Sequence, residues 1–225
     1  MKTTEQKFHD EIEVERMWGP TNQGKYAFFC MLLVTMVLVF GLWDIASHRL
    51  LLIWFSLLTA LNLIRWIVMD YYHNHKHVLI ANIRQVKRVI LFSAAVSGLC
   101  WGLAIFWFLE PSQPGNVLVV SITLIIEVVG AMLTWFCYVP AVIALSFPAA
   151  LALVSSLFLQ GDRVNVAASL SLLLLTIFGV TSSIKLAGML NYALRLNFEN
   201  AELRRESEEK SVSLKIALAE AEHAN

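Results

Sequence analysis

The stretch Leu194-Arg195-Leu196-Asn197-Phe198-Glu199-Asn200-Ala201-Glu202-Leu203-Arg204-Arg205 decides how this chain is organised. The residues before it are largely apolar, whereas residues 191–225 are polar. The stretch combines strong helix formers with side chains of both charge signs and contains neither Gly nor Pro. We therefore expect residues 191–225 to form a polar helix that leaves a membrane.

In the polar segment, Leu214, Leu218, Ala221 and Asn225 fall at four-three-four spacing. Glu206 stands four residues before Lys210, which favours an ion pair on the outer face of the helix. This pattern predicts a two-helix seam and hence a homodimer. A single solvated helix is the alternative, because polar residues at 200, 207 and 211 interrupt any longer heptad repeat.

Composition places the rest of the chain in a membrane. Hydrophobic residues make up 58% of the 225 residues, charged residues make up 15%, and the mean hydropathy is +0.65. Segments of roughly 20 apolar residues cross a hydrocarbon core of about 30 Å. Suitable segments are 26–43, 50–69, 89–109, 116–137, 139–159 and 166–190. The expected fold is all-α, with a polar segment at 1–25, a six-helix transmembrane bundle at 26–190 and a cytoplasmic helix at 191–225.

Basic side chains gather on one side of this predicted bundle. Residues 1–25 hold four Lys or Arg residues and the second connection holds four more, whereas the first and fifth connections hold one each, Arg49 and Arg163. Since basic residues accumulate in cytoplasmic loops, both termini are expected in the cytosol. The formal net charge is zero and no basic patch lies outside these loops, so nucleic acid is not an expected partner.

The outer connections, at 44–49, 110–115 and 160–165, are too short for an extracellular ligand domain. A stimulus would therefore act within the bundle, at its outer mouth or through the bilayer. In the third span, Ala94, Gly98 and Gly102 recur at four-residue steps, which predicts close approach of a neighbouring helix. That neighbour could belong to the same subunit or to a second one.

Ionisable groups inside a bilayer are costly and are candidates for function. Glu127 is eleven residues into the fourth span, and Arg65 lies near the inner end of the second, about 6 Å away in depth at about 1.5 Å per residue. Glu127 could be a hydrogen-bonded acid, one half of an ion pair with Arg65, or a sensing or proton site. Arg65 could instead extend to the headgroups. Asn62 could supply hydrogen bonds, and Trp101 could line an apolar pocket.

The second connection contains alternating His73, His75 and His77. An extended segment would place them on one face, as a metal site requires, but no thiol and only one carboxylate, Asp70, accompanies them. A solvated turn is the favoured interpretation, and no metal site is assigned. Residues 78–88 are amphipathic and basic, which fits either an interfacial helix on acidic lipid or an inner extension of the third span.

Two runs carry a resemblance to a family. Leu-Asn-Phe-Glu-Asn-Ala-Glu-Leu at 196–203 and Ala-Leu-Ala-Glu-Ala-Glu-His-Ala-Asn at 217–225 resemble the signalling helix that joins multi-pass membrane sensors to bacterial, often hybrid, sensor histidine kinases. Ser-Gly-Leu-Cys-Trp-Gly at 97–102 and Leu-Ile-Trp-Phe at 52–55 look like corresponding parts of such six-span input modules. The resemblance implies that this sequence ends just before the phosphoacceptor domain.

The resemblance further implies an inner-membrane homodimer in a bacterial cell. The full-length protein would use ATP and Mg²⁺ to phosphorylate a histidine and then an aspartate of a response-regulator domain. Some similar sensors answer fatty-acid signals, so a small apolar ligand is expected. No cofactor and no catalytic residue is expected within the chain itself. The alternatives are the input domain of a membrane diguanylate cyclase and, in another class, a small transporter or channel with Glu127 as its transport site.

Overall fold

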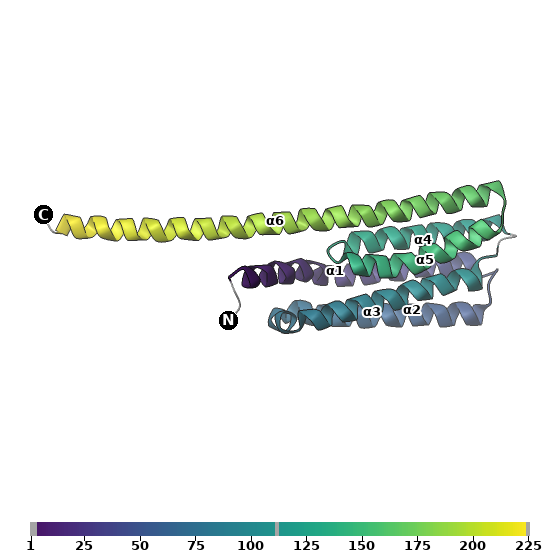
Figure 1. The fold of residues 1–225 in the computed structure, drawn as a ribbon. Helices are drawn as coiled ribbons and strands as arrows, with labels where there is room; N and C mark the ends of the chain where they lie inside the picture. The colour runs from purple at the N-terminus through teal and green to yellow at the C-terminus, as the bar shows by residue number, and fades with distance from the viewer. Residues whose placement is uncertain (1–3, 111–112, 224–225) are drawn as a thin grey trace.

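The computed structural model describes residues 4–110 and 113–223, with side chains for residues 12–18, 24–110 and 113–215. Within these ranges the chain is all-α, as predicted (Figure 1). The helices are α1 Thr4–Leu42, α2 His48–Asn74, α3 Lys76–Phe108, α4 Pro114–Trp135, α5 Val139–Leu159 and α6 Arg163–His223. The described parts of both termini lie beyond the same end of the bundle, which we call its inner end, and the opposite end is called its outer end (Figure 1).

Each of the six helices contains a stretch that is long and apolar enough to cross a membrane. Their outward faces carry large apolar side chains, and those of Phe40 and Leu159 are 85% and 83% exposed. A soluble bundle would present polar side chains on such faces. Helix hydropathy therefore identifies a multi-pass membrane protein, which confirms the prediction of six spans.

Five helices form a ring, and α6 packs on its outside. Around the ring each helix contacts the next in the order α1, α2, α3, α5 and α4, and α4 contacts α1 again. α6 packs mainly along α5 and also contacts α4 and α1. Apolar side chains from all six helices fill the core, including Leu38, Trp54, Trp101, Leu124, Leu153 and Leu172.

α3 and α5 approach closely where small residues line α3. A Cβ atom added to Gly98 would collide with the carbonyl oxygens of Leu145 and Ala144, lying 2.7 Å from the latter. Pro148 has no N–H to donate to the Ala144 carbonyl, the normal helical partner of residue 148, so the α3 backbone covers a carbonyl that lacks this bond. Gly102 lies against the carbonyl of Pro148 in the same way, and Ala94 is buried. The neighbour of this small-residue stripe is thus α5 of the same chain.

Polar side chains fix two of the outer connections. Asn116, at the start of α4, donates to the Phe108 carbonyl at 2.9 Å and accepts from the Glu110 amide at 2.8 Å. Asp162 accepts hydrogen bonds from the Val164 and Asn165 amides, which satisfies two of the free donors at the start of α6. Gly161 before it has φ 74°, a conformation that favours glycine.

The expected boundary at residue 190 is not a helix boundary. α6 contains 61 residues, which corresponds to about 92 Å at 1.5 Å per residue, far more than the bilayer requires. Residues 163–223 contain no proline, so nothing in the backbone ends the helix where the sixth span leaves the membrane. Residues 191–223 are a continuation of the last span, and no separate signalling helix follows it in the described chain.

Two other helices, α1 and α3, begin more than ten residues before their predicted spans. α1 starts at Thr4 and not near residue 26, and its Met17 side chain is only 1% exposed. α3 starts at Lys76, which makes residues 78–88 an inner extension of the third span. A kink at Asn82, with φ −121° and ψ 22°, lies within this extension.

Candidate functional site

Three of the predicted site residues line one small cavity within the bundle. Glu127 comes from α4, and Asn62 and Arg65 come from α2. Glu127 stands eight residues before the inner end of α4 and Arg65 nine before that of α2, so both lie about 12 to 14 Å from those ends. The cavity has a volume of about 70 Å³, and aromatic rings of Phe28, Trp66 and Trp135 complete its wall.

Glu127 is the most deeply buried charged side chain of this cavity. It is 3% exposed, and its Oε2 atom has no hydrogen-bond partner among the described residues. A buried carboxylate without a partner is costly, whether it is charged or neutral. A carboxyl group in this position could exchange a proton or bind a small polar species such as water.

Arg65 lies beside Glu127 but contacts other groups. Its guanidinium donates to Asn62 Oδ1 and lies over the Trp135 ring, 5.8 Å from the centroid. Asn62 in turn donates to the Leu58 carbonyl at 2.9 Å, which fixes the orientation of its amide. No direct ion pair joins Arg65 to Glu127 in the described part of the chain. Trp135 and Asn62 are therefore the immediate partners of the guanidinium.

The size of the cavity limits what it can hold. Drug-sized ligands occupy pockets of roughly 300 to 1,000 Å³, well above the volume found here. Water needs only about 10 to 15 Å³ of such space and two to four polar partners. The Glu127 cavity therefore suits water and protons, and it is too small for a fatty-acid-like ligand.

Trp101, the predicted pocket residue, lies apart from this cavity. Its ring packs edge-to-face against Trp54 at 5.1 Å between centroids and is buried in the apolar core. Trp54 donates to the Cys100 carbonyl at 3.0 Å, whereas the Trp101 Nε1 atom is buried without a partner among the described residues. The structure thus separates Trp101 from Glu127, Arg65 and Asn62.

A second, apolar groove lies between α5 and α6, with a volume of about 270 Å³. Its lining is almost entirely aliphatic and aromatic, including Ile143, Phe147, Leu151, Leu173, Ile177 and Val180. Phe147 and Ile177 are exposed on the outer face of the bundle, so the groove opens to the lipid. Sequence reasoning missed this groove because its residue types are those of any lipid-facing helix surface.

The start of α1 connects the inner ends of other helices. Glu13 pairs with Lys87 and Glu15 with Lys76 of α3, the latter at 2.7 Å. Arg16 donates to Asn191 of α6 at 3.3 Å, and Trp18 stacks on His73 at 5.1 Å. We call residues 13–18 the inner clamp, because they touch α2, α3 and α6.

The inner clamp also approaches the turn between α4 and α5. Burial raises the pKa of the Tyr138 hydroxyl in that turn, and the positive charge of Arg16 opposes the increase. No sequence pattern indicates these contacts, because they depend on how the helices pack.

The remaining predicted residues lie at the inner end and on the tail. His75 stacks on Tyr71 at 4.7 Å, and its ring centroid is 6.0 Å from that of His77. Among the described side chains no three His, Cys, Asp or Glu residues gather as metal ligands would. Leu214 is 64% exposed on α6, whereas the side chains of Leu218 and Ala221 fall outside the described residues.

No protein-family model, curated protein or solved structure matches the chain. The resemblance of residues 196–203 and 217–225 to a signalling helix therefore stays a prediction from sequence.

Proposed function

We propose that the chain is the membrane input module of a bacterial sensor histidine kinase, in which α6 carries the signal to a cytosolic output domain. The observation that supports this proposal is the continuity of α6. One part of the helix packs along α5 and α4, and the rest extends far beyond every other helix (Figure 1). A stiff helix shared by both regions turns a small shift in the bundle into movement at its far end.

The stimulus acts on the bundle through one of its two sites. A small apolar, membrane-borne signal of the fatty-acid type would enter the groove between α5 and α6, where it would contact the output helix directly. Glu127, Arg65 and Asn62 form the polar sensing site, which would respond to protons or water. A stimulus transmits a signal only if it stabilises one arrangement of α6 over another.

The output follows from the resemblance. The full-length protein would bind ATP and Mg²⁺, phosphorylate its own histidine and pass the phosphoryl group to a response-regulator domain. Two copies would pair along residues 191–223, with both termini in the cytosol and the bundle in the inner membrane. Exposed Leu203 and Leu214, eleven residues apart and so on one face of a largely polar helix, support this pairing, because a second helix would bury them.

Two other functions remain candidates. A membrane diguanylate cyclase would use the same input module with another output domain. A small transporter or channel would use Glu127 as its ion or proton site, and the unpartnered Oε2 atom favours that reading. Ion transport, however, gives no role to the long polar part of α6.

The proposal is tested by changing the rotational phase of α6 in the full-length protein. Insertion of two alanines after Asn200 rotates the distal helix by about 200°, whereas insertion of seven residues leaves it within about 20° of its original phase. We expect the two-residue insertion to change basal autophosphorylation in membranes several-fold and the seven-residue insertion to preserve it. Equal autophosphorylation for both insertions would show that α6 does not transmit the signal, and synthesis of cyclic diguanylate would identify a cyclase instead.

A further inference from the structure

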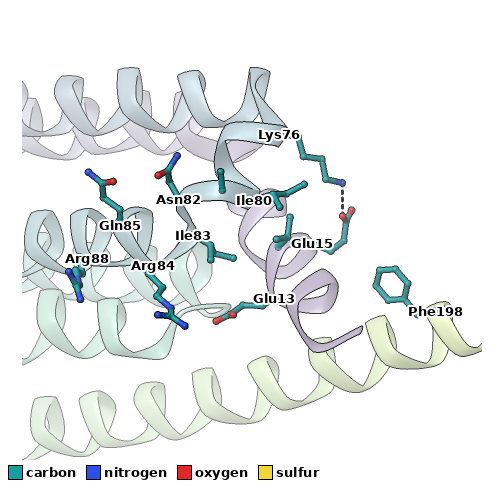
Figure 2. Close-up of a pocket in the computed structure, with 12 residues that line it drawn as sticks. Glu13, Glu15, Lys76, Ile80, Asn82, Ile83, Arg84, Gln85, Arg88 and Phe198 are labelled. Atoms are coloured by element: carbon teal, nitrogen blue, oxygen red, sulfur yellow. Dashed lines mark hydrogen bonds and ion pairs between the residues drawn. The ribbon is translucent and has the colours of Figure 1, made fainter. Parts of the chain in front are cut away.

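An open groove of about 930 Å³ lies at the inner end of the bundle, between α3 and α6 (Figure 2). The inner clamp forms one wall through Glu13, Val14 and Glu15, and Phe198 lines it from α6. α3 and α6 do not pack against each other anywhere in the described chain. The groove therefore occupies the space between the kinked helix α3 and the helix that leaves the membrane.

The charges in the groove are unbalanced. Both acidic residues are neutralised locally, since Glu13 pairs with Lys87 and Glu15 with Lys76. Arg84 and Arg88 line the same groove, and neither forms an ion pair within the described residues. Being four residues apart on one helix, they lie on the same face, so the groove presents two adjacent uncompensated guanidinium groups.

Arg84 and Arg88 lie at the depth expected for lipid headgroups. The apolar part of α3 begins at about residue 89, which places Arg88 at the edge of the hydrocarbon core and Arg84 about 6 Å farther out. Apolar surface lies beside them, because Ile80 is 56% exposed and Ile83 also lines the groove. Asn82 and Gln85 add amide groups, so charge, polar donors and apolar surface lie together (Figure 2).

We propose that this groove binds an anionic phospholipid, whose phosphate contacts Arg84 and Arg88 and whose acyl chains extend toward the hydrocarbon core along exposed Val89 and Phe92 of α3. Guanidinium groups are well suited to this, since their planar donors match phosphate oxygens. A bound lipid would contact α3 and α6 together, at the level where α6 leaves the bundle. Binding requires no output domain, so it holds whether or not the chain belongs to a kinase.

The test measures lipid binding to the purified chain by native mass spectrometry. The matched variants are R84Q/R88Q and R49Q/R163Q, which each remove two exposed arginines, from the inner and outer ends respectively. A basic residue near an anionic surface strengthens binding about fivefold, so R84Q/R88Q should weaken phosphatidylglycerol binding by at least tenfold. R49Q/R163Q should bind like the unmodified chain, and R84K/R88K, which keeps the charges, should recover most of the affinity.

Two ligand controls separate a lipid from other sources of the same chemistry. Phosphatidylcholine has the same acyl chains with no net charge, and its binding should not differ between the variants. Glycerol phosphate supplies the anion without the chains, and it should bind at least tenfold more weakly than phosphatidylglycerol. Equal phosphatidylglycerol binding by R84Q/R88Q and R49Q/R163Q would overturn the proposal, and equal binding of glycerol phosphate would replace the lipid with a soluble phosphate ligand.

Discussion

Glu127 presents the sharpest question at the scale of single residues. Because Arg65 forms no direct ion pair with Glu127, its guanidinium keeps its contacts with Asn62 and Trp135 when the Glu127 charge is removed. We expect Glu127→Gln to reach the membrane at the unmodified folded yield but to change the pH dependence of autophosphorylation in the proposed full-length kinase. Fluorescence-detected size-exclusion chromatography measures the yield.

The double variant supplies the control for this prediction. If Glu127 and Arg65 form an ion pair that holds the fold together, Glu127→Gln will lower the yield and Arg65→Gln will restore part of it. That outcome would contradict the sensing role. Unchanged yield together with unchanged output at every pH would leave Glu127 as a packing residue.

The close packing of Gly98 against α5 can be tested by a stability measurement, without a functional assay. In Gly98→Ala the new methyl group would meet the carbonyls of Ala144 and Leu145, which are backbone atoms and cannot move independently. We expect a loss of about 1 to 3 kcal/mol in unfolding free energy, as for other overpacked sites. Gly188→Ala in α6 is the matched control, because a Cβ there meets no atom within 4 Å. Equal stability of the two variants in a detergent melt would contradict the close contact of α3 with α5.

At the scale of elements, the polar half of α6 has little packing against other helices. Its residues 199–215 are all exposed, and three i,i+4 ion pairs stabilise it, including the predicted Glu206–Lys210 pair at 2.7 Å. Surface pairs of this kind contribute only about 0.3 to 0.5 kcal/mol each. A second helix is therefore the natural source of further stability.

We expect single cysteines along this half of α6 to crosslink between subunits in membranes with a helical period. Cysteines at Leu214, Leu218 and Ala221 should react faster than one at Glu208, in a background without Cys30, Cys100 and Cys137. The charged pairs lie along the outer face of such a dimer, whereas the seam places apolar side chains together. Uniform or absent crosslinking in the full-length protein would exclude a parallel dimer along this seam.

The ends of these elements show what the sequence can predict. Hydropathy placed α4 and α5 within two residues, because both helices are confined to the membrane and are joined by a turn of a few residues. It misplaced the starts of α1 and α3 and the end of α6, because these helices continue as polar segments outside the bilayer. Polar residues end a hydrophobic run without ending a helix.

The candidate site likewise contains residues that the sequence could predict and residues that it could not. Glu127 and Arg65 stand out in the sequence because charged residues within an apolar span are rare. Their common depth and their shared cavity follow from helix length. The inner clamp and the groove at Arg84 and Arg88 could not be predicted, since each depends on which helices lie beside one another.

For the whole molecule, six spans require both termini to lie on one side of the membrane, and basic residues predict that this side is the cytosol. A reporter active only in the cytosol should work when fused after Asn225. A reporter active only in the periplasm should work when inserted after Glu110. The opposite pattern of activities would place the polar end of α6 in the periplasm, where it could not reach the proposed cytosolic output domain.

The central claim is that one unbroken helix links the membrane bundle to the proposed output. Spin labels at Phe178→Cys and Val212→Cys, two exposed positions on α6, test it by pulsed electron–electron double resonance. Labelled chains are diluted with unlabelled chains, so that distances within one subunit dominate. A continuous helix of 34 residues predicts a narrow distribution near 51 Å, at about 1.5 Å per residue. A broad distribution, or a mean below about 40 Å, would show a break or bend after the sixth span and contradict transmission through α6.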